Sequence, residues 1–140
     1  MSYTLTIRQY STQNYNGELE DSPRFITETG VYSMPNRNMR PVLQAFESTG
    51  LATDSASPAY EHGQVSSEKL EAQSGDHVTA AECQLIVRCF KELLADDSEM
   101  EYLYEYLDVE PGQEAPVLSL LTEWIEFNRI AARCDGFIVD

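Results

Sequence analysis

The chain has 140 residues and a formal net charge of −15, from 24 Asp and Glu against 9 Lys and Arg residues. A chain of this length can bury a sufficient apolar core without disulfides or metals, so we expect one domain. No apolar run approaches the ~18 residues of a membrane-spanning helix, and the first ten residues lack the features of a signal peptide. We therefore expect a cytoplasmic protein that does not bind a membrane.

The negative charge is concentrated in the second half of the chain. Residues 1–70 contain 8 acidic and 5 basic residues, whereas residues 71–140 contain 16 acidic and 4 basic residues. A field of this sign repels phosphate backbones and attracts basic surfaces. The charge therefore argues against direct binding of nucleic acid and favours a basic protein as the partner.

The N-terminal segment predicts two strands. Tyr3, Leu5 and Ile7 alternate with polar residues, which is typical of a half-buried strand. Residues 24–34 are rich in β-branched and aromatic residues and predict a second strand that is interrupted or bulged at Gly30. An antiparallel pairing of the two strands is the simplest arrangement.

A short helix is expected next, followed by a long polar excursion. Asn38 can cap a helix over residues 38–48 that has Pro41 in its first turn. Residues 49–78 contain few large apolar side chains and predict only a short helical piece near residues 66–72. Long loops in compact domains are commonly functional or disordered, and this one contains His62 and His77.

The last part of the chain, residues 79–140, is predicted to be helical with a closing strand. Thr79 and Glu82 form a capping box at the start of a helix that runs to residue 95. A final helix is expected over residues 115–133, and residues 136–140 predict a strand that joins the N-terminal sheet. The apolar positions that we expect to bury this final helix are Leu118, Leu121, Trp124, Ile125, Phe127 and Ile130.

The predicted fold class is therefore α+β. A small antiparallel sheet, built from the N-terminal strands and the C-terminal strand, packs against three to four helices. Strands and a short helix occupy residues 1–48, the polar excursion occupies residues 49–78, and the helical part with the closing strand occupies residues 79–140.

Residues 96–114 contain eight acidic residues and three tyrosines but no Lys or Arg. Apolar side chains at i, i+3, i+4 and i+7 predict a helix over residues 98–108, which Ser98 and Glu101 would start as a second capping box. On this helix an exposed acidic ridge is expected, which we define by Glu101, Tyr102, Glu105, Tyr106 and Asp108.

The sequence assigns no catalytic residue, metal or cofactor. It contains no phosphate-binding glycine loop, nucleophile elbow or zinc-protease motif. The acids near Asp96 lack the glycine and spacing of a calcium loop. Three cysteines, Cys83, Cys89 and Cys134, cannot all pair internally and are expected to be reduced core residues.

Three functional interpretations remain open at this point. In the first, the acidic ridge binds a basic surface on a partner, such as a nucleic-acid-binding protein; inhibitors, immunity proteins and nucleic-acid mimics use this electrostatic principle. In the second, the chain is a small enzyme whose site forms around residues 51–78 and their histidines. In the third, the domain is a structural or interaction module and the ridge is only solvated. The oligomeric state is left open.

Overall fold

The computed structural model describes residues 2–10, 25–53 and 65–140 and confirms the predicted α+β class. Its main sheet consists of β1 (Ser2–Ile7), β2 (Val31–Pro35), β5 (Asp76–Val78) and β6 (Phe137–Val139). The strands lie in the order β2-β1-β6-β5, and all neighbours are antiparallel. A small parallel pair is formed by β3 (Ala52–Thr53) and β4 (Val65–Ser66).

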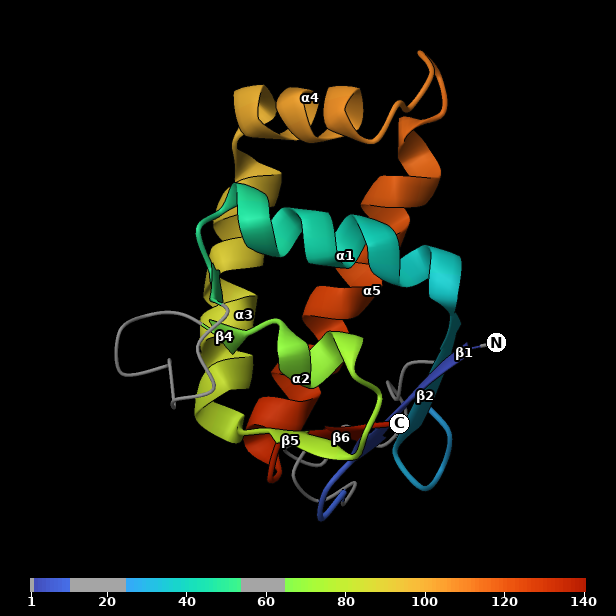
Figure 1. Cartoon of the computed structure of the whole chain (residues 1–140), viewed down its shortest axis with the longest axis vertical. Coiled ribbons are helices and arrows are strands. Elements are labelled where there is room, and N and C mark those ends of the chain that lie inside the picture. Colours follow the sequence, from blue (N-terminus) through green and yellow to red (C-terminus); the bar gives the residue numbers. More distant parts are fainter. Residues whose placement is uncertain (1, 11–24, 54–64) are drawn as a thin grey trace.

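The described residues also form five helices. They are α1 (Asn36–Ser48), α2 (Glu68–Glu71), α3 (Ala80–Ala95), α4 (Asp97–Tyr106) and α5 (Glu114–Arg133). The long helices α3 and α5 run side by side, α1 crosses them, and α4 lies across the end of the molecule that is farthest from the sheet (Figure 1). Helix α4 is thus separated from the sheet by the lengths of α3 and α5.

The closing strand is placed as predicted. Leu5 of β1 faces Val139 of β6, and both side chains are fully buried. The chain enters β6 through Gly136, whose φ is +68°. A Cβ atom at this position would lie 1.9 Å from the carbonyl oxygen of Val78, so only glycine fits between α5 and the sheet.

The second strand is shorter than predicted. β2 begins at Val31, and Gly30 lies in a tight turn in which its amide donates to the Thr27 carbonyl oxygen at 2.9 Å. The φ of Gly30 is +81°, a backbone conformation that glycine adopts without strain. The strand is thus interrupted at Gly30, as predicted, and Ile26 before the turn forms an isolated antiparallel bridge with Tyr32.

The start of α1 also differs from the prediction. Pro35 occupies the N-cap position and Asn38 lies inside the helix, so Asn38 does not cap it. Pro41 is consequently an interior residue and removes one helical hydrogen bond. The carbonyl that loses this bond belongs to Arg37, an exposed residue, which lets water satisfy it.

Residues 65–78 are more regular than the predicted excursion. They include β4, the short helix α2 and β5, which adds an edge strand to the main sheet. Val65, Leu70 and Val78 are fully buried. Few apolar residues are present here, but nearly all of them point into the core. His62 lies outside the described residues.

The core is built around aromatic contacts between the helices and the sheet. Trp124 of α5 packs against rings from α1, α3 and β6, at centroid distances of 6.0–6.4 Å. Leu118 is an exception to the predicted core because 42% of it is exposed. The first turns of α5 face the core through Val117 and Leu120, which directs Leu118 to solvent.

Within the described ranges, no helix combines the length and the apolar character that crossing a membrane requires.

Candidate functional site

Helix α4 presents the acidic ridge, but its cap is not the predicted one. Asp96 is extended, and its Oδ1 accepts a hydrogen bond from the amide of Glu99 at 3.1 Å. The helix consequently begins at Asp97, before the predicted Ser98 cap. Asp and Ser are comparable N-caps, so the sequence alone could not choose between them.

The two sides of α4 differ sharply in burial. Met100 and Leu103 are buried against the rest of the chain. On the other side Glu101 and Glu105 are exposed, and Tyr102 and Tyr106 expose 61% and 57% of their surface. Within the described part of the chain, these two tyrosines and Leu118 are the exposed large hydrophobic side chains. The ridge is therefore an amphipathic surface as well as an acidic one.

Asp108 does not continue the helical ridge as predicted, because α4 ends at Tyr106. Its φ is +56°, the left-handed conformation that closes many helices. The amide of Val109 donates to the Tyr104 carbonyl oxygen at 2.9 Å, and the amide of Asp108 donates to that of Glu105 at 3.1 Å. These two bonds form a Schellman motif in which Asp takes the position usually held by Gly.

A groove lies beside the ridge, where α4 approaches the start of α5. It has a volume of about 410 Å³ and is lined by side chains that include Glu101, Tyr102, Tyr104, Glu105, Pro111 and Glu114. We call it the α4–α5 groove. A smaller depression of about 220 Å³ lies over Tyr102, Glu105 and Tyr106. The surface beside the ridge is thus hollowed.

Glu114 is fixed at the rim of this groove. Its Oε2 accepts a hydrogen bond from the backbone amide of Gly112 at 2.9 Å. Tyr104 is half-buried, and its pKa is raised, first by burial and second by the negative charge of Glu114. Residues from two helices therefore place a tyrosine hydroxyl and a carboxylate in the same electrostatic environment.

The acids of the ridge form no ion pair within the described part of the chain. No Lys, Arg or His among the described residues forms an ion pair with Glu101, Glu105 or Asp108. The bases of the second half lie elsewhere, in α3 and α5. There Arg129 binds Glu126 and lowers its pKa, an effect to which other nearby bases, Arg133 and Lys91, contribute. Bases of α3 and α5 thus offset the charge of Glu126, whereas the surface of α4 remains negative.

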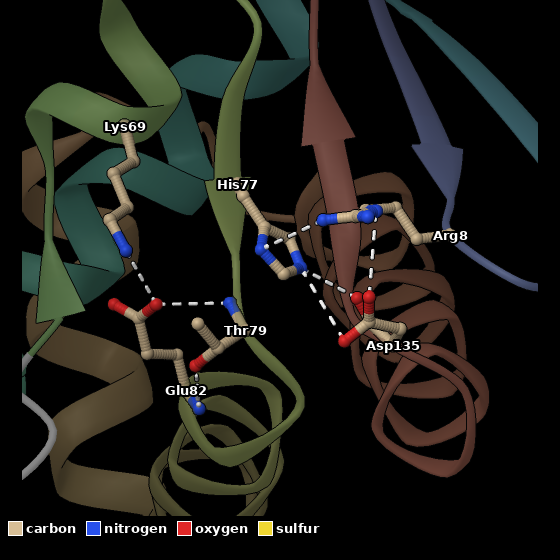
Figure 2. A network of polar contacts seen from close by, with 6 residues as sticks. All are labelled: Arg8, Lys69, His77, Thr79, Glu82 and Asp135. Carbon is tan, nitrogen blue, oxygen red and sulfur yellow. Dashed lines mark hydrogen bonds and ion pairs between the residues drawn. The ribbon is translucent and has the colours of Figure 1, made fainter.

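The histidine that the structure describes, His77, is part of a different polar cluster (Figure 2). Its Nε2 lies 2.6 Å from the backbone oxygen of Asp135, and its Nδ1 lies 3.5 Å from Nη1 of Arg8. Because a guanidinium only donates, Nδ1 accepts and Nε2–H donates. The carboxylate of Asp135 is 4.0 Å from Nε2. Both ring nitrogens thus contact protein groups, and the contact of Nδ1 with the exposed Arg8 is the longer of the two.

Glu82 is a buried acid whose contacts hold the fold together (Figure 2). Its Oε1 lies 2.6 Å from Nζ of Lys69 and accepts the amide of Thr79 at 3.0 Å. Thr79 Oγ1 accepts in turn from the Glu82 amide at 3.2 Å, which confirms the predicted capping box. The ion pair with Lys69 was not predicted, since the two residues belong to α2 and α3 and nothing in their spacing joins them.

The three cysteines form no disulfide with one another, and Cys83 is buried in α3. Burial raises the pKa of the Cys83 thiol well above its usual value, which disfavours the reactive thiolate. The described ranges contain no group of three or more His, Cys, Asp or Glu side chains that could hold a metal ion.

Comparison with known proteins provides no functional assignment: no family model, curated protein or solved structure matches this chain.

Proposed function

We propose that this chain is a non-enzymatic binding protein whose acidic ridge occupies a basic surface on another protein. The observation that carries the proposal is the exposure of Tyr102 and Tyr106 beside Glu101 and Glu105, which form no ion pair with any Lys, Arg or His that the structure describes. Tyrosine is enriched among residues that dominate binding energy, because it supplies a large rigid surface with a polar end. Flanking carboxylates accelerate association with a partner of opposite charge.

A partner that handles DNA or RNA fits this surface best. Carboxylates four positions apart on a helix are separated by about 6 Å along the axis, similar to the interval between phosphates along a nucleic-acid strand. Glu101 and Glu105 have this spacing. The proposal therefore includes inhibitors, immunity proteins and nucleic-acid mimics, all of which cover a cationic site.

A merely solvated ridge accounts less well for the tyrosines. Charged residues on an exposed helix need no partner, since most surface charges have none. Two adjacent tyrosines that expose more than half of their surface are harder to explain in this way. An enzyme centred on His77 is less favoured because both of its ring nitrogens already contact protein groups.

The test compares two variants that lose the same charge at different places. The ridge variant is Glu101→Gln with Glu105→Gln, and the control is Glu68→Gln with Glu71→Gln, which neutralises two exposed acids of α2. Tagged wild type and both variants are used to capture proteins from a lysate of the natural host. Each retained protein is then purified and its dissociation constant measured at two salt concentrations.

Support requires a basic partner whose affinity falls at least tenfold in the ridge variant and stays within about twofold in the control, with binding weakened by salt. Equal affinities for all three forms would contradict the proposal. An equal loss in both variants would also contradict it, because binding would then follow net charge and not the ridge.

A further inference from the structure

We propose that the α4–α5 groove receives one arginine side chain of the basic partner as an anchor. This inference rests on the proposed function and specifies the chemistry that the groove recognises. It concerns the groove beside the ridge and in particular Glu114, which lies at the start of α5 and is not part of the ridge.

The groove brings together carboxylates from two separate elements. Glu101 and Glu105 belong to α4, whereas Glu114 reaches it from α5. None of the residues that line the groove is basic. A cation from another molecule is therefore the complement that this lining lacks.

The carboxylate of Glu114 is held ready for such a ligand. Its Oε2 is fixed by the amide of Gly112, a residue whose φ of +90° shapes the loop before α5. Among the residues that the structure describes, no hydrogen bond has Glu114 Oε1 as its acceptor. Preorganisation of this kind reduces the entropy that binding costs.

The shape and lining favour arginine over lysine and over a metal ion. Tyr102 and Tyr104 lie in the groove together with the carboxylates, so a planar cation can stack on a ring while it donates to an acid. A guanidinium has both properties, whereas an ammonium is a compact and strongly hydrated point charge. A metal ion is the weaker alternative, because no described acids here have a ligand arrangement.

The experiment uses the full chain and two small probes, N-acetyl-arginine methylamide and N-acetyl-lysine methylamide. Each is titrated into ¹⁵N-labelled protein, and the amide resonance of Gly112 is the reporter because it is bonded to Glu114. We expect saturable shifts at Gly112 and in α4, with the arginine probe binding at least about threefold more tightly than the lysine probe.

Two variants make the assignment specific. Glu114→Gln keeps an acceptor for the Gly112 amide but removes the charge, and we expect it to weaken the arginine probe at least about fivefold. The control, Glu68→Gln with Glu71→Gln, is expected to bind as wild type does. Equal affinity for the two probes, or shifts distributed equally over remote acids, would overturn the inference.

The same variant separates this inference from the proposed function. If the purified partner binds Glu114→Gln as tightly as wild type but loses the Glu101→Gln, Glu105→Gln variant, the groove is not the anchor site while the ridge remains the binding surface. If the arginine probe binds as expected and no partner depends on the ridge, the groove recognises guanidinium and the proposed function is wrong.

Discussion

Helices α3 and α4 are neighbours in the chain and both begin with a side-chain cap, but they differ in what they bury. Helix α3 lies against α5 and buries Ile86, Phe90 and even the carboxylate of Glu82. Helix α4 buries little beyond Met100 and Leu103. Tyr102 and Tyr106 of α4 face solvent, although aromatic residues of α3 and α5 form the core.

This difference shows that the role of an acidic residue depends on the groups that it contacts. Glu82 has a cation, two capping contacts and almost no exposure, so its chemistry serves folding. Glu101 and Glu105 are exposed, and no base in the described ranges pairs with them. The chain therefore uses one acid to join α2 to α3, whereas the acids of α4 remain available to another molecule.

The largest expected effect lies in the core of the α3–α5 pair. Trp124→Ala should destabilise the fold by roughly 3–5 kcal/mol, because it leaves a cavity among the surrounding rings. Tyr102→Ala should change stability by no more than about 0.5 kcal/mol, as surface substitutions do. Urea unfolding measures both. Similar losses in the two variants would mean that α4 belongs to the core, which would remove the contrast.

The buried ion pair gives the next largest effect. Lys69→Met should cost about 2–3 kcal/mol, because it leaves the charge of Glu82 buried without a cation. The cost stays below that of a fully buried pair, since 25% of the Lys69 side chain is exposed. The chain has a second lysine, Lys91, which is exposed, and Lys91→Met is the matched control. Equal stability of the two variants would contradict the role assigned to Glu82.

An alkaline titration tests the burial of Tyr32, a residue of the core. Tyr32 is buried against Phe127 and donates a long hydrogen bond of 3.4 Å to Glu123. Burial first, and Glu123 second, raise the Tyr32 pKa well above its usual value of 10. A group whose pKa is raised on folding stabilises fully below the unfolded pKa and loses that contribution as the pH rises further.

Above pH 10, wild type should therefore lose up to about 1.4 kcal/mol per pH unit more than Tyr32→Phe. Denaturant midpoints between pH 8 and pH 11 measure this difference. Parallel pH profiles for the two proteins would show that Tyr32 ionises without a penalty.

The smallest effect concerns the end of α4. Asp108→Gly should stabilise the fold by about 0.5 kcal/mol, because glycine adopts positive φ without strain. Asp108→Asn removes the same charge and tolerates the same conformation, so it should leave stability nearly unchanged. Thermal unfolding of both separates backbone strain from charge; a loss of stability on Asp108→Gly would argue against the Schellman closure.

Periodicity predicted the parts of the fold in which one face is buried. The alternation at Tyr3, Leu5 and Ile7, the capping box at Thr79 and the closing strand are confirmed because local sequence and burial agree there. The predicted start of α1 was wrong, since proline is compatible with several local structures. The partner strand of β5 is distant in sequence, so that pairing could not be predicted.

The candidate site was only partly predictable. The ridge residues follow from helical spacing, and the structure places four of them on α4. The α4–α5 groove and Glu114 were missed because they depend on how the chain turns after Asp108, where an aspartate adopts a conformation typical of glycine. Likewise, no sequence signal indicated the pairing of Lys69 with Glu82.

Amide hydrogen exchange on the complex with its purified basic partner tests the central claim most directly. The account predicts that binding slows exchange in residues 97–106 and leaves the remote helix α2 unchanged. Protection confined to other elements, with α4 exchanging as in the free protein, would contradict the claim that this helix forms the binding surface.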